Sequence, residues 1–134
     1  MIPTMTESPR DLIVSTVIPV SDMARSREFY EQAVGLTGEP APGGHVLHAG
    51  AGTRLFLLDG SESYAGQAGW PLASFLATDL AATVAVMHSR GVIFDIMDGD
   101  PYQTDERGIA DFGTTLIAWF RDPDNQVISI VQPT

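Results

Sequence analysis

The stretch S-T-V-I-P-V-S-D at residues 15–22 determines the fold, because it returns later in the chain as L-A-S-F-L-A-T-D at residues 72–79. Each stretch is an apolar strand that ends in aspartate and runs directly into a segment of helical length. Asp22 and Asp79 are suited to cap those helices, since aspartate is among the preferred residues at a helix start. The chain therefore reads as two copies of one small unit.

The segments after the two helices also match. Gly35 and Gly91 stand where the helices are expected to end. Residues 45–59 and residues 116–131 then each contain two short apolar runs around a polar turn, and the second turn is D-P-D-N. Each unit is predicted to contain a strand, a helix and three further strands, which indicates an α+β fold.

The repeat also sets the expected domain organisation. Residues 1–10 are interpreted as an N-terminal arm, residues 11–60 as the first module, residues 61–69 as a Gly/Ser-containing linker and residues 70–134 as the second module. Half of a 134-residue chain is too short to bury a core alone. We therefore expect one structural domain overall.

The amino-acid composition restricts the expected location of the protein and the kinds of chemical site that it can contain. The chain has no cysteine, so disulfides, thiolate metal sites and cysteine nucleophiles are excluded. No apolar run is long enough to span a bilayer, and the first ten residues do not resemble a signal peptide. A cytoplasmic location is the expectation.

The formal net charge of -10 bears on partners. The chain has no lysine and seven arginines, which are scattered, so it lacks the basic clusters that bind phosphate backbones or anionic membranes. Neither nucleic acid nor a membrane is expected as a partner. The acidity either confers solubility alone or indicates a preference for cationic small molecules.

Alternation along the strands predicts which side chains face the helices. In the first strand Ile18 and Val20 share one face, while Ser15 and Val17 share the other; in the equivalent strand Phe75 has the apolar role. The helices are expected to cover the Ile18 and Phe75 faces. The opposite face of each sheet is then free to line a cavity, provided that the two sheets curve toward each other.

Two motifs of this sequence resemble those of a known protein family. V-S-D-M-A-R-S-R-E-F-Y-E-Q-A-V-G-L at residues 20–36 and F-R-D-P-D-N-Q-V-I-S-I-V at residues 120–131 resemble the vicinal oxygen chelate superfamily, which contains glyoxalases, bleomycin-resistance proteins and extradiol dioxygenases. The resemblance implies two tandem βαβββ modules that form a curved mixed sheet around a central cavity. It also implies a homodimer.

The metal positions of that family do not carry over. Its metalloenzymes usually have histidine at the positions of Ser15 and Leu72, and a carboxylate at those of Leu57 and Ser129. Two serines and two leucines are not the convergent His, Asp and Glu donors that a divalent metal requires. No metal and no cofactor are therefore expected.

Histidine and carboxylate side chains provide further candidates for a catalytic site. A metal held instead by His45, His48 and His88 is an alternative, but the first two are three residues apart in a predicted strand and so point to opposite faces. A general acid or base is sought among His48, Asp59 and Glu106. The sequence contains neither a G-x-S-x-G motif nor a phosphate-binding glycine loop.

Aromatic residues suggest a small-molecule site. Trp119 stands in a predicted strand, where it is either core or pocket wall. Residues 98–113 are expected to form a longer loop, which is either a surface excursion or functional. An apolar, aromatic cavity with a few polar groups is typical of ligand sites. The residues expected to line it are Ser15, Val17, His48, Leu57, Leu72, Ser74, Tyr102, Phe112, Trp119 and Ser129.

Three functional hypotheses follow. The first is a metal-free binding protein, similar to the bleomycin-resistance branch, that sequesters an antibiotic or other natural product, with a cationic or planar aromatic ligand. The second is a lyase, isomerase or dioxygenase of the same fold that has non-standard metal ligands or none. The third is a regulatory module whose ligand modulates a partner protein.

Overall fold

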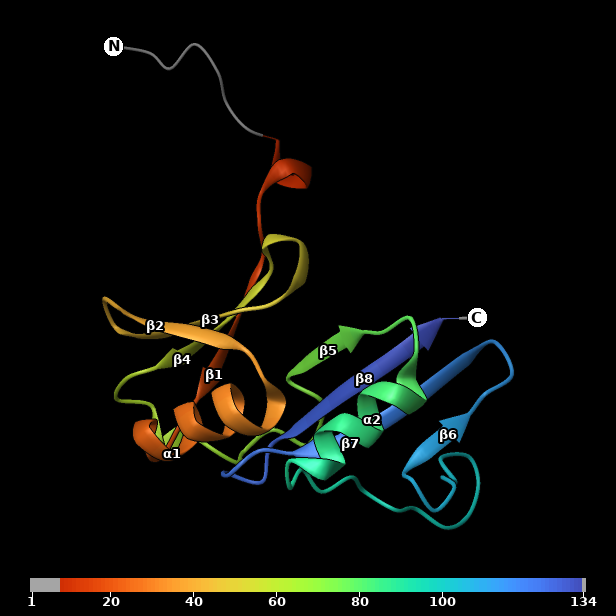
Figure 1. Ribbon diagram of the computed structural model, residues 1–134. Helices are drawn as coiled ribbons and strands as arrows, with labels where there is room; N and C mark the ends of the chain where they lie inside the picture. The colour runs from red at the N-terminus through yellow and green to blue at the C-terminus, as the bar shows by residue number, and fades with distance from the viewer. Residues whose placement is uncertain (1–7, 134) are drawn as a thin grey trace.

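Two four-stranded mixed sheets, each with a helix, make up the chain, for which the computed structural model describes residues 8–133 (Figure 1). The strand order is β1-β4-β3-β2 in the first sheet and β5-β8-β7-β6 in the second. In each sheet the first strand pairs in parallel with the last, and the remaining pairs are antiparallel. The strands are β1 (Ser15–Pro19), β2 (Thr37–Ala41), β3 (Gly44–His48), β4 (Arg54–Leu58), β5 (Ala73–Leu76), β6 (Ile109–Asp111), β7 (Thr115–Arg121) and β8 (Val127–Pro133).

The helical elements complete two copies of the βαβββ unit, which confirms the predicted fold. In the first module α1 passes directly into a π-helical segment, η2, whereas α2 of the second module is a regular helix. Among the described residues no helix is both long and apolar enough to cross a membrane. The helices are α1 (Met23–Glu28), η2 (Phe29–Val34) and α2 (Leu80–Ser89), and the short 3₁₀ turns are η1 (Pro9–Asp11), η3 (Gly50–Gly52) and η4 (Glu62–Tyr64).

The helix boundaries follow the repeated capping residues. The Asp22 side chain accepts a hydrogen bond from the Arg25 amide, and the Asp79 side chain accepts one from the Ala82 amide, each at 3.1 Å. Gly35 stands in the left-handed region, with φ at 99°, where a β-carbon would be strained. These contacts satisfy backbone groups that a helix end leaves unpaired. The predicted starts of both helices are confirmed.

One hydrophobic core serves both modules. Ile18 is 0% exposed and Val20 is 4% exposed, as the strand alternation predicted. They belong to the same cluster as Val84 of α2 and Phe120 of β7, and the Phe29 ring lies 6.1 Å from the Phe120 ring. The helix-bearing faces of the two sheets therefore meet at a shared core, and the other face of each sheet, here called its open face, points away from it.

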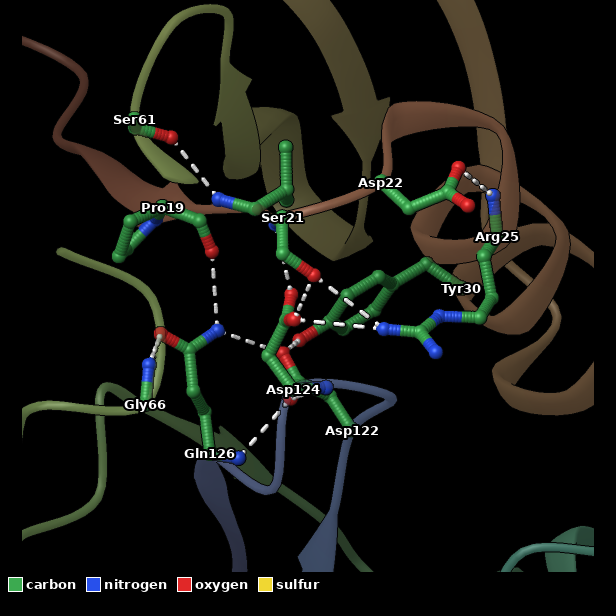
Figure 2. Close-up of polar contacts among 11 residues, drawn as sticks. Pro19, Ser21, Asp22, Arg25, Tyr30, Ser61, Gly66, Asp122, Asp124 and Gln126 are labelled. Atoms are coloured by element: carbon green, nitrogen blue, oxygen red, sulfur yellow. Dashed lines mark hydrogen bonds and ion pairs between the residues drawn. The ribbon is translucent and has the colours of Figure 1, made fainter. Parts of the chain in front are cut away.

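A buried polar network joins the two modules (Figure 2). The Tyr30 hydroxyl donates to Oδ2 of Asp122 at 2.8 Å, and Nε2 of Gln126 donates to the same oxygen at 2.8 Å. Gln126 Nε2 also donates to the Pro19 carbonyl, and its Oε1 accepts from the Gly66 amide in the linker. The first module, the linker and the last turn of the second module are thus held together at one place.

The same turn makes a second, more exposed contact with the first module. The Asp124 carboxylate accepts hydrogen bonds from the amide and hydroxyl of Ser21 and lies 3.4 Å from an Arg25 nitrogen. The D-P-D-N turn therefore closes the last hairpin and also anchors the start of α1.

The environment of Tyr30 changes the pKa of its hydroxyl. Burial, followed by the negative charge of Asp122, raises that pKa well above its usual value.

The sequence did not locate every element. The short β6 lies inside the stretch expected to be a continuous loop, and neither it nor β2 was placed by the apolar pattern. Residues 1–7 of the expected N-terminal arm lie outside the described residues, and Pro9–Asp11 form η1.

Candidate functional site

The open face of the second sheet brings together three of the predicted site residues. Ser74 of β5, Ser129 of β8 and Trp119 of β7 lie in register across the sheet. The Ser129 hydroxyl donates to the Ser74 hydroxyl at 2.9 Å. Ala118 and Phe120, the neighbours of Trp119, are both 0% exposed, so alternation directs the Trp119 side chain away from the core.

Tyr102 contacts Trp119 there, and Phe112 in turn contacts Tyr102. The ring of Tyr102 lies edge-on to Trp119, with centroids 6.2 Å apart, and edge-on to Phe112 at 6.3 Å. The loop is closed by a hydrogen bond from the Met97 amide to the Thr104 hydroxyl and another from the Thr104 amide to the Met97 carbonyl. Tyr102 and Phe112 are 54% and 39% exposed, so these three residues, the aromatic trio, present ring surface to solvent.

Acidic residues are frequent in the segment that carries Tyr102. The loop that carries Tyr102 also carries Asp98 and Asp100, which form no ion pair within residues 8–133. The nearby cations are already engaged, since Arg107 pairs with Asp105 and Arg121 with Asp95. The segment from residue 95 to residue 111 therefore carries an excess of negative charge.

Asp105 holds the loop near β6. Its burial opposes ionisation, but hydrogen bonds from the Ile109 amide and from the Arg107 side chain and amide outweigh that effect and lower the pKa of the Asp105 carboxyl. Asp105 is therefore an anion that organises the loop.

The open face of the first sheet carries the other polar candidates. Ser15 of β1, Arg54 of β4 and His48 of β3 lie in register, and Val17 lies next to Phe56. Nε2 of His48 is 3.1 Å from Oε1 of Glu39. Val17 is 54% exposed. This face is thus partly apolar and separate from the aromatic trio.

Two of the predicted ligand-binding residues pack against the shared core. Leu57 is 0% exposed, because its register with Ile18 turns it toward the shared core. Leu72 is half-buried and also packs against that core. Phe56, which the same alternation places on the open face of the first sheet, was missed, although its position one residue before Leu57 is the signal that would have found it.

The residues do not fit the usual metal site of related metalloenzymes. Ser15 and Ser129 lie on open faces of different sheets, and the two leucines pack against the core. The described part of the chain contains no group of three or more His, Cys, Asp or Glu that could hold a metal ion.

The remaining titratable candidates are dispersed. His45 is 2% exposed on the core side of β3, with Nε2 3.5 Å from Oε1 of Glu31, whereas His48 points to the open face, as predicted. His88, Asp59 and Glu106 are exposed. Their positions do not bring an acid, a base and a nucleophile together.

A family model matches most of the chain. Residues 12–130 match the Glyoxalase/Bleomycin resistance protein/Dioxygenase superfamily. A comparison with curated protein sequences gives no match.

Solved structures of similar proteins share the fold. TnmS3, described as an antibiotic binding protein from Streptomyces sp. CB03234, is 26% identical with a TM-score of 0.67, over 96% of this chain and 100% of that one. The oxidase ChaP-H1 is 19% identical with a TM-score of 0.66, over 92% and 96% of the two chains. A glyoxalase/bleomycin resistance protein/dioxygenase from Alicyclobacillus acidocaldarius is 14% identical with a TM-score of 0.66, over 92% of each chain.

Proposed function

Because the chain belongs to the Glyoxalase/Bleomycin resistance protein/Dioxygenase superfamily, we propose that it is a small-molecule binding protein that sequesters an antibiotic or other natural product without a metal ion. The observation that carries the proposal is the aromatic trio of Tyr102, Phe112 and Trp119 on an open sheet face. Exposed rings beside a few hydroxyl groups provide stacking area and limited polar recognition, which suit binding.

The similarity to TnmS3 supports the same proposal. That protein is an antibiotic binding protein, and its likeness extends over nearly the whole of both chains. The likeness to the oxidase ChaP-H1, at 19% identity, concerns the fold. Within the described residues no catalytic constellation accompanies the aromatic trio, so the structure offers the enzyme hypothesis no specific support.

The ligand class follows from shape and charge. A flat ring system can stack against Trp119 or Tyr102, whose rings are perpendicular, with an interplanar angle of 88°. The carboxylates of Asp98 and Asp100 on the same loop form no ion pair with another described residue and favour a positive charge on the ligand, and cations also interact well with aromatic faces. We therefore propose a planar aromatic cation.

A homodimer is part of the proposal. The open faces of the two sheets point away from the shared core, so within one chain they do not enclose a common space. A second copy can place its first-sheet face, with Val17 and His48, opposite the aromatic trio. Light scattering is expected to give the mass of two chains, and a clean monomer mass with ligand bound would contradict this arrangement.

The direct test is a ligand screen by thermal shift with planar cationic antibiotics, planar neutral ones and non-planar cationic ones. Planar cations are expected to raise the melting temperature most, and Trp119→Ala is expected to remove the gain.

Metal content, measured on protein never exposed to a chelator or a metal column, distinguishes the binding protein from a metal-dependent enzyme. Stoichiometric metal together with conversion of a bound compound would overturn the proposal in favour of an enzyme. The cytoplasmic location and the module boundaries remain predictions.

A further inference from the structure

A partly open cavity of about 550 Å³ lies between the two modules. Thr16 of β1 and Leu55 of β4 line it from the first sheet, while Ala73 and Phe75 of β5 line it from the second. Leu55 is 5% exposed, and Ala73 and Phe75 pack against the shared core. The cavity is therefore an apolar extension of that core that reaches solvent.

This cavity differs from the proposed antibiotic site. None of the aromatic trio lines it, although two of its lining residues, Ser74 and Arg54, also belong to the open faces of the two sheets. Thr16, Ala73 and Phe75 line the cavity from the core side of their strands, whereas Trp119 faces the opposite side of the second sheet. A compound bound here would contact neither Tyr102 nor Trp119.

The charge at the cavity is opposite in sign to that of the chain. Among the described residues no acidic side chain lines it, and Arg54 is the only charged residue that does, in a chain with 17 acidic and 7 basic residues. Within residues 8–133 the Arg54 side chain takes part in no ion pair or hydrogen bond, whereas Arg25, Arg27, Arg107 and Arg121 are all paired with carboxylates. An unpaired guanidinium beside an apolar wall is suited to an anion with an apolar body.

We propose that this cavity binds a small apolar carboxylate. Arg54 at the rim pairs with the carboxylate, and the Leu55 and Phe75 side chains contact the apolar body. The volume is within the range of small-molecule sites, roughly 300–1,000 Å³. Most of the binding free energy comes from the apolar walls, because an exposed ion pair contributes little.

The probe is decanoate, with decyltrimethylammonium as a chain of equal length and opposite charge, both below their aggregation concentrations. Titration followed by amide chemical shifts gives the affinity and the location together. We expect decanoate to shift the amides of Ala49, Thr53 and Leu55 and to leave those of Tyr102 and Phe112 unchanged.

Variants of two residues test the geometry. Ala49→Phe places a ring in the cavity from the η3 loop and is expected to weaken decanoate binding at least about tenfold, since it removes the space. Ala49→Ser is the matched control and keeps wild-type affinity. Arg54→Gln is expected to weaken decanoate binding by up to about fivefold without changing binding of the cation.

Three outcomes would overturn the proposal: equal affinity for both probes in the wild type, decanoate shifts centred on Trp119, or full affinity in Ala49→Phe. A fourth is dissociation of a wild-type dimer by Ala49→Phe, because a second copy of the chain would then be the occupant. Trp119→Ala is expected to leave decanoate binding intact, so failure of this proposal is distinguishable from failure of the antibiotic-binding proposal.

Discussion

The Tyr30 hydroxyl donates a 2.8 Å hydrogen bond to Asp122, a residue 92 positions later in the chain. Tyr30 is 0% exposed and Asp122 is 5% exposed. The backbone amide and the side-chain amide of Gln126 donate to the same carboxylate, so both oxygens of Asp122 accept hydrogen bonds from the protein itself. This contact links the helix of the first module to the last turn of the second, and it sets how the two modules are joined.

Replacing Tyr30 with Phe is expected to lower the free energy of unfolding by about 1–3 kcal/mol, because a buried carboxylate loses one of its donors while the ring packing is kept. Urea denaturation measures the change. Tyr64→Phe is the control, since Tyr64 is 70% exposed and its loss of a hydroxyl should have almost no effect. Equal stability of the Tyr30 variant and the wild type would show that the contact contributes nothing net.

The same residue predicts a response to alkaline pH. The folded protein raises the pKa of Tyr30 above its ordinary value of 10.0, so the folded state holds this proton more tightly than the unfolded chain does. The resulting stabilisation is complete below pH 10 and is lost as the pH rises toward the folded-state pKa. Urea denaturation from about pH 8 to about pH 11 should show a steeper loss of stability for the wild type than for Tyr30→Phe. Parallel curves would refute the assignment.

Trp119→Ala is expected to abolish the thermal shift given by a planar cationic ligand while costing less stability than the roughly 3–5 kcal/mol typical of a buried tryptophan. The reason is that Trp119 lies on an open face, where its ring is half-buried. Trp70→Ala is the matched control, because Trp70 is 65% exposed and lies outside the site. A large loss of stability with ligand binding retained would assign Trp119 to the core.

The capping residues allow a paired comparison. Asp22→Ala and Asp79→Ala should each lower the free energy of unfolding by about 1 kcal/mol, since each carboxylate accepts one amide hydrogen bond at the first turn of its helix. Asp→Asn at the same positions should restore most of the loss. A much larger effect at one position would mean that the two repeats no longer use their caps in the same way.

The sequence predicted the elements whose apolar pattern or capping is strong. The strands β1 and β5, both helix starts and the two final hairpins follow from alternation, Asp caps and the D-P-D-N turn. The strand β2 did not follow, because T-G-E-P-A contains glycine and proline and little that favours a strand; β6 has three residues, too few for a pattern. The π-helical turn of η2 has no sequence signal of its own.

The site was predicted less completely than the fold, because the faces of its residues depend on strand register and on contacts between distant segments. Residue type suggested Trp119, Tyr102 and Phe112, and the structure brings these three together. The predicted role of Leu57 came from a family position, whereas its register with Ile18 turns its side chain toward the core. The link between Tyr30 and Asp122 is a contact between distant segments, which no local pattern encodes.

The joint at the last turn also bears on the history of the chain. Met87 stands at the same distance from its capping aspartate as Tyr30 does, and the turn of the first module reads A-G-A-G-T where the second reads D-P-D-N-Q. The polar partners of this joint are therefore found only in the helix of the first module and the turn of the second. The duplication that the repeat implies was therefore followed by divergence of the two halves at this joint. A chain built from two copies of either half would lack one side of the joint.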